Sequence, residues 1–220
     1  MPASGAARAY EEATPPRLPR RTPLGGVRFV VLDSETTGFN PARDRILSLA
    51  AMPVRDGGMR VSDLQSWLVY HSDIPMTDAV RVHGILPSDA REGAPEQVVL
   101  EQLLPLISGA VLVGHHIGFD VRMLNEALGR RFGIRLRNPT IDTATLAMQT
   151  VEAFRKTGYA GQRTPSLEEV CTHLGIAPLE RHTAPGDTFT TAELFLVLCA
   201  RHARDLRRPL TVADLPIERA

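Results

Sequence analysis

The sequence VVLDSETTG at residues 30–38 combines an apolar run with two carboxylates and a glycine. The β-branched stretch from Val27 to Leu32 predicts a buried strand. Because side chains alternate along a strand, Asp33 and Glu35 should point to the same side at its end. The Thr-Thr-Gly after them predicts a tight exit loop, where glycine lets backbone N–H groups approach a phosphate or a sugar hydroxyl. The segment predicts either an acidic site at a sheet edge or an ordinary loop whose acids act as caps.

The pattern around this segment predicts an α/β fold. Further strands are expected at Ile46–Val54 and Val61–Val69, joined by the strong hairpin-turn signal Asp56-Gly57-Gly58. Short apolar strands are expected at residues 110–113 and 140–141. Helical spacing of apolar residues predicts helices over residues 95–107, 119–132, 143–154, 166–174 and 185–206. Since a hairpin gives antiparallel neighbours and helical crossovers give parallel ones, we expect a mixed five-stranded sheet flanked by helices.

Length and composition favour a single domain. With 220 residues, 43% of them apolar, the chain can bury one real core. We expect this domain at residues 26–205, preceded by a flexible arm at residues 1–25 and followed by a short tail at residues 206–220. A short helix at residues 7–13 is an option within the arm. No apolar run approaches the roughly 18 residues of a membrane span, and the N-terminus lacks a secretory signal, so a soluble, cytoplasmic protein is expected.

Charge and cysteine content narrow the function classes. The formal net charge is zero, so the chain lacks the overall basic field of a protein that coats nucleic acid, and any such attraction must be local. Arginines cluster at positions 130, 131, 135 and 137 and at positions 201, 204, 207 and 208; solvated faces and phosphate contacts are both open for them. The two cysteines, Cys171 and Cys199, form no CxxC pair, which argues against a disulfide framework or a zinc site.

Two later segments add candidate ligands. In GHHIGFD, residues 114–120, a strand ends in a glycine-containing loop and Asp120 opens a helix, either as a cap or as a metal ligand. In HTAPGD, residues 182–187, Pro185 suits a first helical turn, so Asp187 should lie at the front of the last long helix while His182 stays on the loop before it. Each segment alone also fits an ordinary helix start.

Together the three segments are more specific than any one of them. Four carboxylates and one loop histidine are placed at strand ends and helix starts, where open sheets collect ligands. Carboxylate oxygens suit Mg²⁺ or Mn²⁺. Two such ions and a neutral histidine that takes a proton from water are the parts of a two-metal phosphodiester hydrolase.

The stretches VVLDSETTG, GHHIGFD and HTAPGD, in this order, resemble the three motifs of the DEDDh exonuclease family. That family includes the proofreading epsilon subunit of bacterial DNA polymerase III, RNase T and oligoribonuclease. The likeness extends from about residue 27 to residue 200, and VHGI at residues 82–85 and IDT at residues 141–143 resemble segments of the epsilon group.

The resemblance implies a ribonuclease-H-like fold and a 3′→5′ exonuclease that releases nucleoside 5′-monophosphates. It implies that two Mg²⁺ or Mn²⁺ ions are held by Asp33, Glu35, Asp120 and Asp187, with Asp33 bridging them, and that His182 is the general base. It places five further residues near the terminal nucleotide, each with a structural alternative: Thr36, Thr37, Gly38, His83 and Phe119. His116 stands where family members often have Asn, which bears on a substrate contact or a loop hydrogen bond.

Several questions stay open at this stage. DNA is the favoured substrate, with an RNA-directed exoribonuclease of the RNase T or oligoribonuclease type as the alternative, because sequence does not display a 2′-hydroxyl contact. A non-catalytic nucleic-acid-binding or partner-binding module is a third option, although all five catalytic-type residues are present. The expected partner is a single-stranded or frayed 3′ end. A homodimer is open, and the short tail argues against a stable contact with a polymerase subunit.

Overall fold

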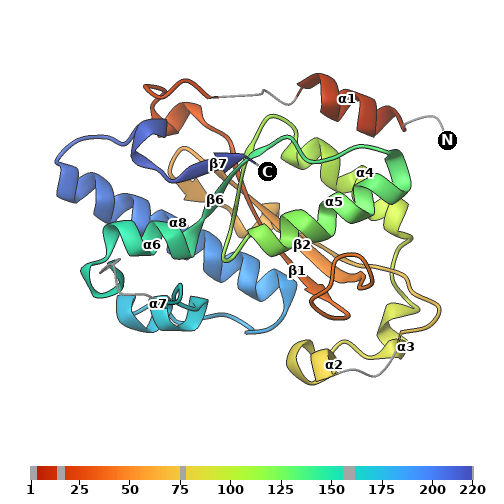
Figure 1. Cartoon of the computed structure of the whole chain (residues 1–220). Helices are drawn as coiled ribbons and strands as arrows, with labels where there is room; N and C mark the ends of the chain where they lie inside the picture. Colours follow the sequence, from red (N-terminus) through yellow and green to blue (C-terminus); the bar gives the residue numbers. More distant parts are fainter. Residues whose placement is uncertain (1–3, 14–17, 75–77, 156–161, 220) are drawn as a thin grey trace.

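The computed structural model describes residues 4–13, 18–74, 78–155 and 162–219 (Figure 1). Its strands are β1 (Phe29–Thr36), β2 (Ile46–Arg55), β3 (Gly58–Met59), β4 (Gln65–Leu68), β5 (Val111–Gly114), β6 (Pro139–Asp142) and β7 (Ile217–Arg219). Its α-helices are α1 (Gly5–Ala13), α2 (Asp78–His83), α3 (Pro87–Ala90), α4 (Glu96–Ile107), α5 (Gly118–Phe132), α6 (Thr143–Thr150), α7 (Leu167–Leu174) and α8 (Ala184–Leu206). Single 3₁₀ turns lie at η1 (Leu24–Gly26), η2 (Val61–Asp63), η3 (Glu152–Phe154) and η4 (Val212–Asp214).

The strands form one mixed sheet with β1 near its centre. The order is β3-β2-β1-β5-β6-β7, with β4 paired to another part of β2. β1 runs antiparallel to β2 and parallel to β5, and β5 runs parallel to β6. The tight turn that joins β2 to β3 has positive φ at Asp56 and Gly57, as a two-residue hairpin of this type requires. The predicted mixed sheet is therefore confirmed. The predicted turn at residues 56–58 is present, but it joins β2 to the short β3 and not directly to the strand expected at residues 61–69.

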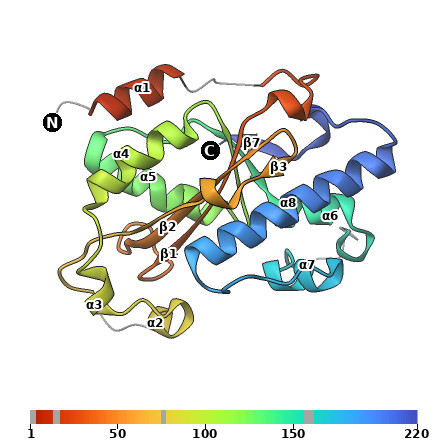
Figure 2. The same cartoon turned by 180° about the vertical axis from the view of Figure 1, so that it is seen from behind.

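Alternation along β1 divides the core between the two faces of the sheet. Val30 and Leu32 pack in a cluster with α4 and α5, while Phe29 and Val31 pack in a second cluster with α6, α7 and α8. Figures 1 and 2 show these two groups of helices on opposite sides of the sheet. α2 and α3 lie at the end of the molecule where β1 ends (Figure 1). This arrangement leaves the carboxyl end of β1 open between α2, α5 and the start of α8.

The sheet is larger than the sequence predicted. Seven strands are paired, not five. All five expected strands are present, and β3 and β7 are additional. The expected strand at residues 61–69 is shorter than predicted, since its first residues form η2 and only β4 pairs with β2. β3 and β7 are too short to show a periodic pattern in the sequence. Each forms because a neighbouring strand pairs with it.

The described parts of both terminal segments pack against the domain. α1 packs against α4, and Ala7 and Tyr10 are buried. Farther along, the Thr22 carbonyl accepts a hydrogen bond from the backbone of Val212. The C-terminal segment then adds β7 to the edge of the sheet beside β6. Residues 1–3 and 14–17 of the predicted arm, and residue 220 of the tail, lie outside the described residues.

Within the described ranges, no helix combines the length and the apolar character needed to cross a membrane.

Candidate active site

The last residues of β1 send side chains to two different sides. Asp33 and Glu35 share the side of Val31, which faces α8, and Ser34 points the other way. The hydroxyl of Ser34 donates a hydrogen bond of 2.6 Å to the Asp120 carboxylate in the first turn of α5. β1 therefore presents two acids to α8 and a hydroxyl to α5.

The start of α8 supplies the third acid of the site. Thr183 caps the helix, and its hydroxyl accepts a hydrogen bond of 3.1 Å from the backbone N–H of Gly186. The preceding loop passes very close to this turn, since a Cβ at residue 186 would lie 2.4 Å from the carbonyl oxygens of Leu179 and Glu180. Only glycine fits there without a shift of the backbone. This contact fixes the loop with Arg181 and His182 beside Asp187.

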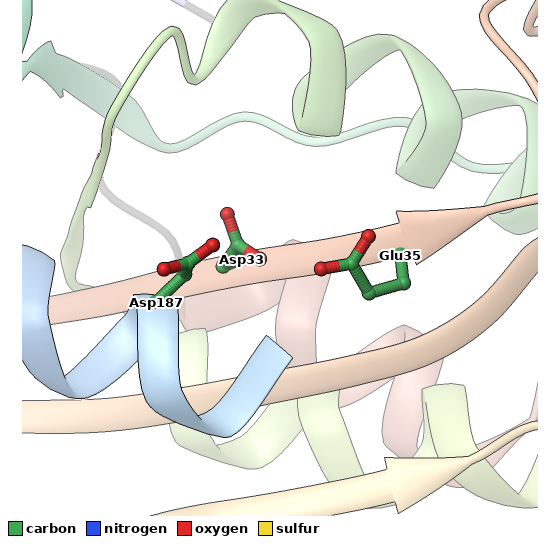
Figure 3. Close-up of side chains that lie close together, drawn as sticks. All are labelled: Asp33, Glu35 and Asp187. Carbon is green, nitrogen blue, oxygen red and sulfur yellow. The ribbon is translucent and has the colours of Figure 1, made fainter. Parts of the chain in front are cut away.

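Three carboxylates meet at this point. Oxygens of Asp33, Glu35 and Asp187 all lie within 4.8 Å of one another. Figure 3 shows the two acids of β1 and the acid of α8 close together. The sequence did not establish this proximity, because Asp187 follows the β1 acids by about 150 positions in the chain.

Asp120 is adjacent to this group but not part of it. It is buried, and its carboxylate accepts the Ser34 hydrogen bond. Its negative charge reaches the group, because it contributes to a raised pKa at both Asp33 and Glu35. Of the four acids expected from the sequence, three converge directly and Asp120 lies next to them.

Burial and mutual repulsion make these acids hard to ionise in the metal-free protein. Burial, together with the charges of Asp187 and Asp120, raises the pKa of Glu35 to about 7. Burial also raises the pKa of Asp120 to about 7, against the opposing effect of the Ser34 hydrogen bond. The pKa of Asp33 is raised well above its usual value by burial and by the three neighbouring acids. The cluster therefore has the electrostatics of a site that favours a cation.

The positively charged side chain of Arg181 lies at the cluster. The guanidinium of Arg181 donates a hydrogen bond of 2.8 Å to Oδ1 of Asp187, and the backbone N–H of His182 lies 3.2 Å from Oδ2. Sequence reasoning missed both Arg181 and Ser34. Arg181 directly precedes the HTAPGD motif, but nothing in its spacing indicated that its side chain turns toward the acids.

His182 occupies an exposed position on the rim of the site. Its backbone is left-handed, with φ of 63°, which is uncommon for a residue other than glycine. The imidazole lines the same cavity as Asp33, Glu35 and Asp187. The histidine expected from the sequence is therefore beside the acids and open to solvent.

The cavity has a volume of about 450 Å³, in the range of small-molecule sites. One wall is apolar and is formed by Phe39, Val82 and Phe119. Phe39 is 88% exposed, and its ring lies 5.9 Å from that of Phe119. An aromatic pair of the exposed Phe39 and the half-buried Phe119, beside the acids, offers a surface on which a planar base can stack.

Four of the five residues expected near a terminal nucleotide line this cavity: Thr36, Gly38, His83 and Phe119. Thr37 does not, since its hydroxyl donates a 2.8 Å hydrogen bond to Asp44 and accepts one from the backbone of Arg45. A Cβ at residue 38 would lie 2.7 Å from the Asp44 carboxylate, which explains why glycine stands there. In the strand-end loop, Thr37 and Gly38 thus serve the turn itself.

His83 closes the back of the cavity. Its side chain is buried, and its Nδ1 accepts a hydrogen bond from the backbone N–H of Ile85. Burial lowers the pKa of His83, so the ring is neutral near pH 7. With Nδ1 accepting, the proton belongs on Nε2. The backbone of Thr36 lies near enough to this ring to oppose the fall in its pKa.

His116, for which the sequence left a substrate contact or a loop hydrogen bond open, also lines the cavity. Its φ is 58°, a left-handed conformation in which Asn is enriched among residues other than glycine. The ring of His116 makes a 3.0 Å hydrogen bond with Thr164. Histidine thus keeps a loop hydrogen bond at this position.

With this geometry in place, comparison with known proteins is decisive. The model of the exonuclease family RNase_T matches residues 30–195, well over half of the chain. The chain belongs to the exonuclease family. It is therefore a nuclease-family enzyme, and the strand-end and helix-start motifs that suggested this from the sequence fall inside the match.

Relatives of this exonuclease include DNA polymerase components. A DNA polymerase III subunit epsilon-like protein of Rhodobacter capsulatus is 33% identical over 84% of this chain and 26% of the relative. The DNA polymerase III subunit epsilon of Aquifex aeolicus is 28% identical over 84% of this chain and 87% of the relative. A PolC-type DNA polymerase III of Thermotoga petrophila is 30% identical over 76% of this chain, which spans only 12% of that polymerase.

Solved structures agree on the fold of the exonuclease domain. Escherichia coli exonuclease I in complex with a dT13 oligonucleotide superposes with a TM-score of 0.67 at 19% identity, covering 82% of this chain and 43% of that one. A second structure of exonuclease I, 20% identical with a TM-score of 0.66, is a zinc-bound form. These similarities show that the chain shares the fold of these exonuclease structures.

The residues of this exonuclease fit a divalent cation. The exonuclease family is metal-dependent, and the acidic cluster offers hard oxygen donors in close proximity. Burial is the main cause of the raised pKa values of Asp33 and Glu35, and the neighbouring carboxylates add to it. A bound cation would favour the charged form of these acids.

Proposed function

We propose that this exonuclease hydrolyses the terminal phosphodiester of DNA strands in the 3′→5′ direction and releases nucleoside 5′-monophosphates. The observation that carries the proposal is the convergence of Asp33, Glu35 and Asp187 beside the exposed His182, next to a cavity with an aromatic wall. The cavity volume suits a single nucleotide.

In this proposal the acids hold two divalent ions, Mg²⁺ or Mn²⁺. Asp33, Glu35 and Asp187 are the direct ligands, and Asp120 joins them from the α5 side, where Ser34 now holds it. Such ions lower the pKa of bound water and stabilise charge that develops on phosphate oxygens. The three converging carboxylates and the adjacent Asp120 support this assignment.

The protein groups have distinct tasks. The imidazole of His182 takes a proton from the attacking water, whose oxygen forms the new bond to phosphorus. The bond from phosphorus to the 3′ oxygen of the preceding nucleotide breaks, and that oxygen leaves as a hydroxyl after protonation. Phe39 and Phe119 stack on the terminal base, and the Nε2–H of His83 lies at the back of the cavity for an acceptor on the nucleotide. Thr36 and Gly38 border the same space.

DNA is the proposed substrate because the sequence relatives are named as DNA polymerase III proteins and a similar solved structure contains DNA. The epsilon and PolC relatives are DNA polymerase III proteins, and the exonuclease I structure holds a DNA oligonucleotide. A single-stranded or frayed 3′ end fits a cavity that accepts one base at a time. The mechanism uses groups from one chain, so it requires neither a homodimer nor a polymerase subunit.

A cytoplasmic location, expected from the sequence, is part of the same proposal. Both described cysteines are free thiols, which suits a reducing compartment.

The test uses matched DNA and RNA oligonucleotides labelled at the 5′ end, incubated with purified protein and Mg²⁺ or Mn²⁺. We expect a ladder of progressively shorter DNA products, with released nucleotides that chromatography identifies as 5′-monophosphates. Asp33→Asn should abolish the ladder while leaving the circular dichroism spectrum unchanged. Asp205→Asn, which alters an exposed acid on α8, should cleave like the wild type. Faster loss of RNA than of DNA would contradict the substrate assignment, and equal activity in the Asp33 variant would contradict the mechanism.

A further inference from the structure

Arg181 forms an ion pair with Asp187 that a bound metal ion would have to change. Its guanidinium lies 2.8 Å from Oδ1 of Asp187, and both side chains are largely shielded, with 25% and 11% of their surfaces exposed. The other oxygen of Asp187 accepts the His182 backbone N–H. Both oxygens of this candidate ligand therefore have donors, and one of the donors carries a full positive charge.

The charge of Arg181 acts on the whole acidic cluster. It opposes the rise in pKa not only of Asp187 but also of Asp33 and Glu35. Two other Arg–Asp pairs occur among the described residues, Arg204–Asp205 and Arg208–Asp214. In the second pair, the pKa of Asp214 is lowered, chiefly by its hydrogen bond with Arg208. Within the described ranges, Arg181 is the basic side chain that pairs directly with a member of the three converging carboxylates.

The backbone around Arg181 is suited to a change of side-chain position. Its neighbours Glu180 and His182 are both left-handed, with φ of 38° and 63°. Such conformations are sparsely populated for residues other than glycine and tend to occur in switch or site segments. The loop is held at its far end by the close contact with Gly186.

We propose that Arg181 is a resident counter-cation, which neutralises the metal-free carboxylate cluster and leaves Asp187 when a divalent ion binds. This inference rests on the proposed function, since it assigns the cluster to metal. An arginine at 2.8 Å from a ligand oxygen and a divalent ion on the same carboxylate repel each other strongly. Arg181 therefore sets the affinity of the cluster for metal, and with Arg181 in place the protein remains folded without a bound metal ion.

The experiment measures Mn²⁺ binding by isothermal titration calorimetry and melting temperature in EDTA. Arg181→Gln removes the charge and keeps a polar side chain. Since a unit charge and a divalent ion about 6 Å apart repel by an amount worth roughly tenfold in affinity even in water, we expect the variant to bind Mn²⁺ roughly tenfold more tightly. It should also melt at a lower temperature than the wild type in EDTA and gain more from added Mn²⁺. Arg208→Gln, the matched change in an Arg–Asp pair away from the cluster, should leave Mn²⁺ affinity unchanged.

The outcomes separate this inference from the proposed function. Unchanged or weaker Mn²⁺ binding in Arg181→Gln, or no binding in either protein, would overturn the inference. If the Gln variant folds only with Mn²⁺, the ion takes the place of the arginine charge, and this result supports the inference. Should it not fold at all, Arg181→Lys tests the inference instead. Its side chain is shorter and carries a single point of charge, so the Lys variant of the protein should bind Mn²⁺ more tightly than the wild type. If the wild type and Arg181→Gln bind Mn²⁺ as expected but the wild type cleaves no oligonucleotide, the result contradicts the proposed function and not the role of Arg181.

Discussion

The imidazole at position 182 combines exposure with a left-handed backbone, and its own N–H group supports Asp187. Asn tolerates this backbone conformation and keeps the N–H, but it has no group that accepts a proton near pH 7. We therefore expect His182→Asn to lower the rate of hydrolysis by roughly 10²- to 10⁴-fold, as for loss of a general base. Its melting temperature and Mn²⁺ affinity should stay close to those of the wild type. Single-turnover rates measure the effect, and a rate within a few-fold of wild type would exclude the base.

Residue identity predicted the acids better than it predicted their neighbours. Asp33 and Glu35 share one side because strand alternation is fixed, and Asp187 lies at a helix start that Pro185 signals. Arg181 could not be predicted, since the direction of its side chain depends on how the loop packs against Gly186. Ser34 was also missed, because its hydroxyl gains a partner only when α5 packs beside β1.

At the scale of elements, the start of α8 depends on its close contact with the preceding loop. A Cβ at residue 186 would lie 2.4 Å from two backbone carbonyl oxygens, which cannot rotate away. We expect Gly186→Ala to destabilise the protein by about 1–3 kcal/mol, as overpacking does, and to reduce hydrolysis because Asp187 and His182 both move. Urea unfolding and the oligonucleotide assay test this.

Gly129 provides the matched control for that change. It lies in α5, and a Cβ there meets nothing within 4 Å. Gly129→Ala should leave hydrolysis unchanged and stabilise the protein by roughly 0.5–1 kcal/mol, since alanine is the better helix former. Equal effects of the two substitutions would refute the argument from close contact.

α1 attaches the N-terminal segment to the core through one polar side chain. The hydroxyl of Tyr10 donates to the side chain of Asn138 and accepts the backbone N–H of Arg137 at 2.9 Å. Tyr10→Phe would leave these buried groups without partners, so we expect a loss of about 1–3 kcal/mol in stability. The deficit should appear in urea unfolding without a change in the rate constant for hydrolysis. A variant as stable as the wild type would mean that α1 contributes little.

Elements with a clear period were predicted, and elements that depend on a partner were not. α4, α5, α7 and α8 carry apolar positions at helical spacing, and each begins and ends within about two residues of its prediction. α2 and α3 have too few residues to show a period. The apolar face of α1 is short, and its burial comes from α4 and from the Asn138 contact, which no local pattern displays.

Across the whole molecule, zero net charge is the sum of an acidic site and locally balanced arginines. Arg130 and Arg131 both pair with the buried Glu96, so these two members of their cluster have a partner within the protein. Arg204 and Arg208 also have acidic partners, Asp205 and Asp214. Half of the arginines in the two clusters that the sequence left open as phosphate contacts are therefore engaged in internal ion pairs. At the acidic site, by contrast, Asp33, Glu35 and Asp187 converge with Asp120 beside them, and Arg181 pairs with Asp187.

This convergence of acids makes the stability of the metal-free protein depend on pH. Burial and like charges raise the pKa of Glu35 and of Asp120 to about 7, above their ordinary values of 4.5 and 3.8. Between the ordinary and the raised values the folded state binds more protons than the unfolded state, so stability falls as pH increases through this window. The metal-free protein should therefore be less stable at pH 8 than at pH 5.5, as far as these groups decide it. Divalent ions favour the charged carboxylates and should remove most of the difference.

Glu35→Gln isolates one group of the cluster. A neutral amide of similar shape cannot ionise, so in EDTA it should stabilise the protein at pH 8 by on the order of 1–3 kcal/mol and by less at pH 5.5. With saturating Mn²⁺ the sign should reverse, because the amide is a poorer ligand than the carboxylate. Urea unfolding at both pH values, with EDTA and with Mn²⁺, measures all four conditions. Glu92→Gln changes an exposed acid and should alter none of them. If the Glu35 variant were less stable than the wild type in EDTA at pH 8, the repulsion inferred for this cluster would be wrong, and with it the reason why the site calls for a cation.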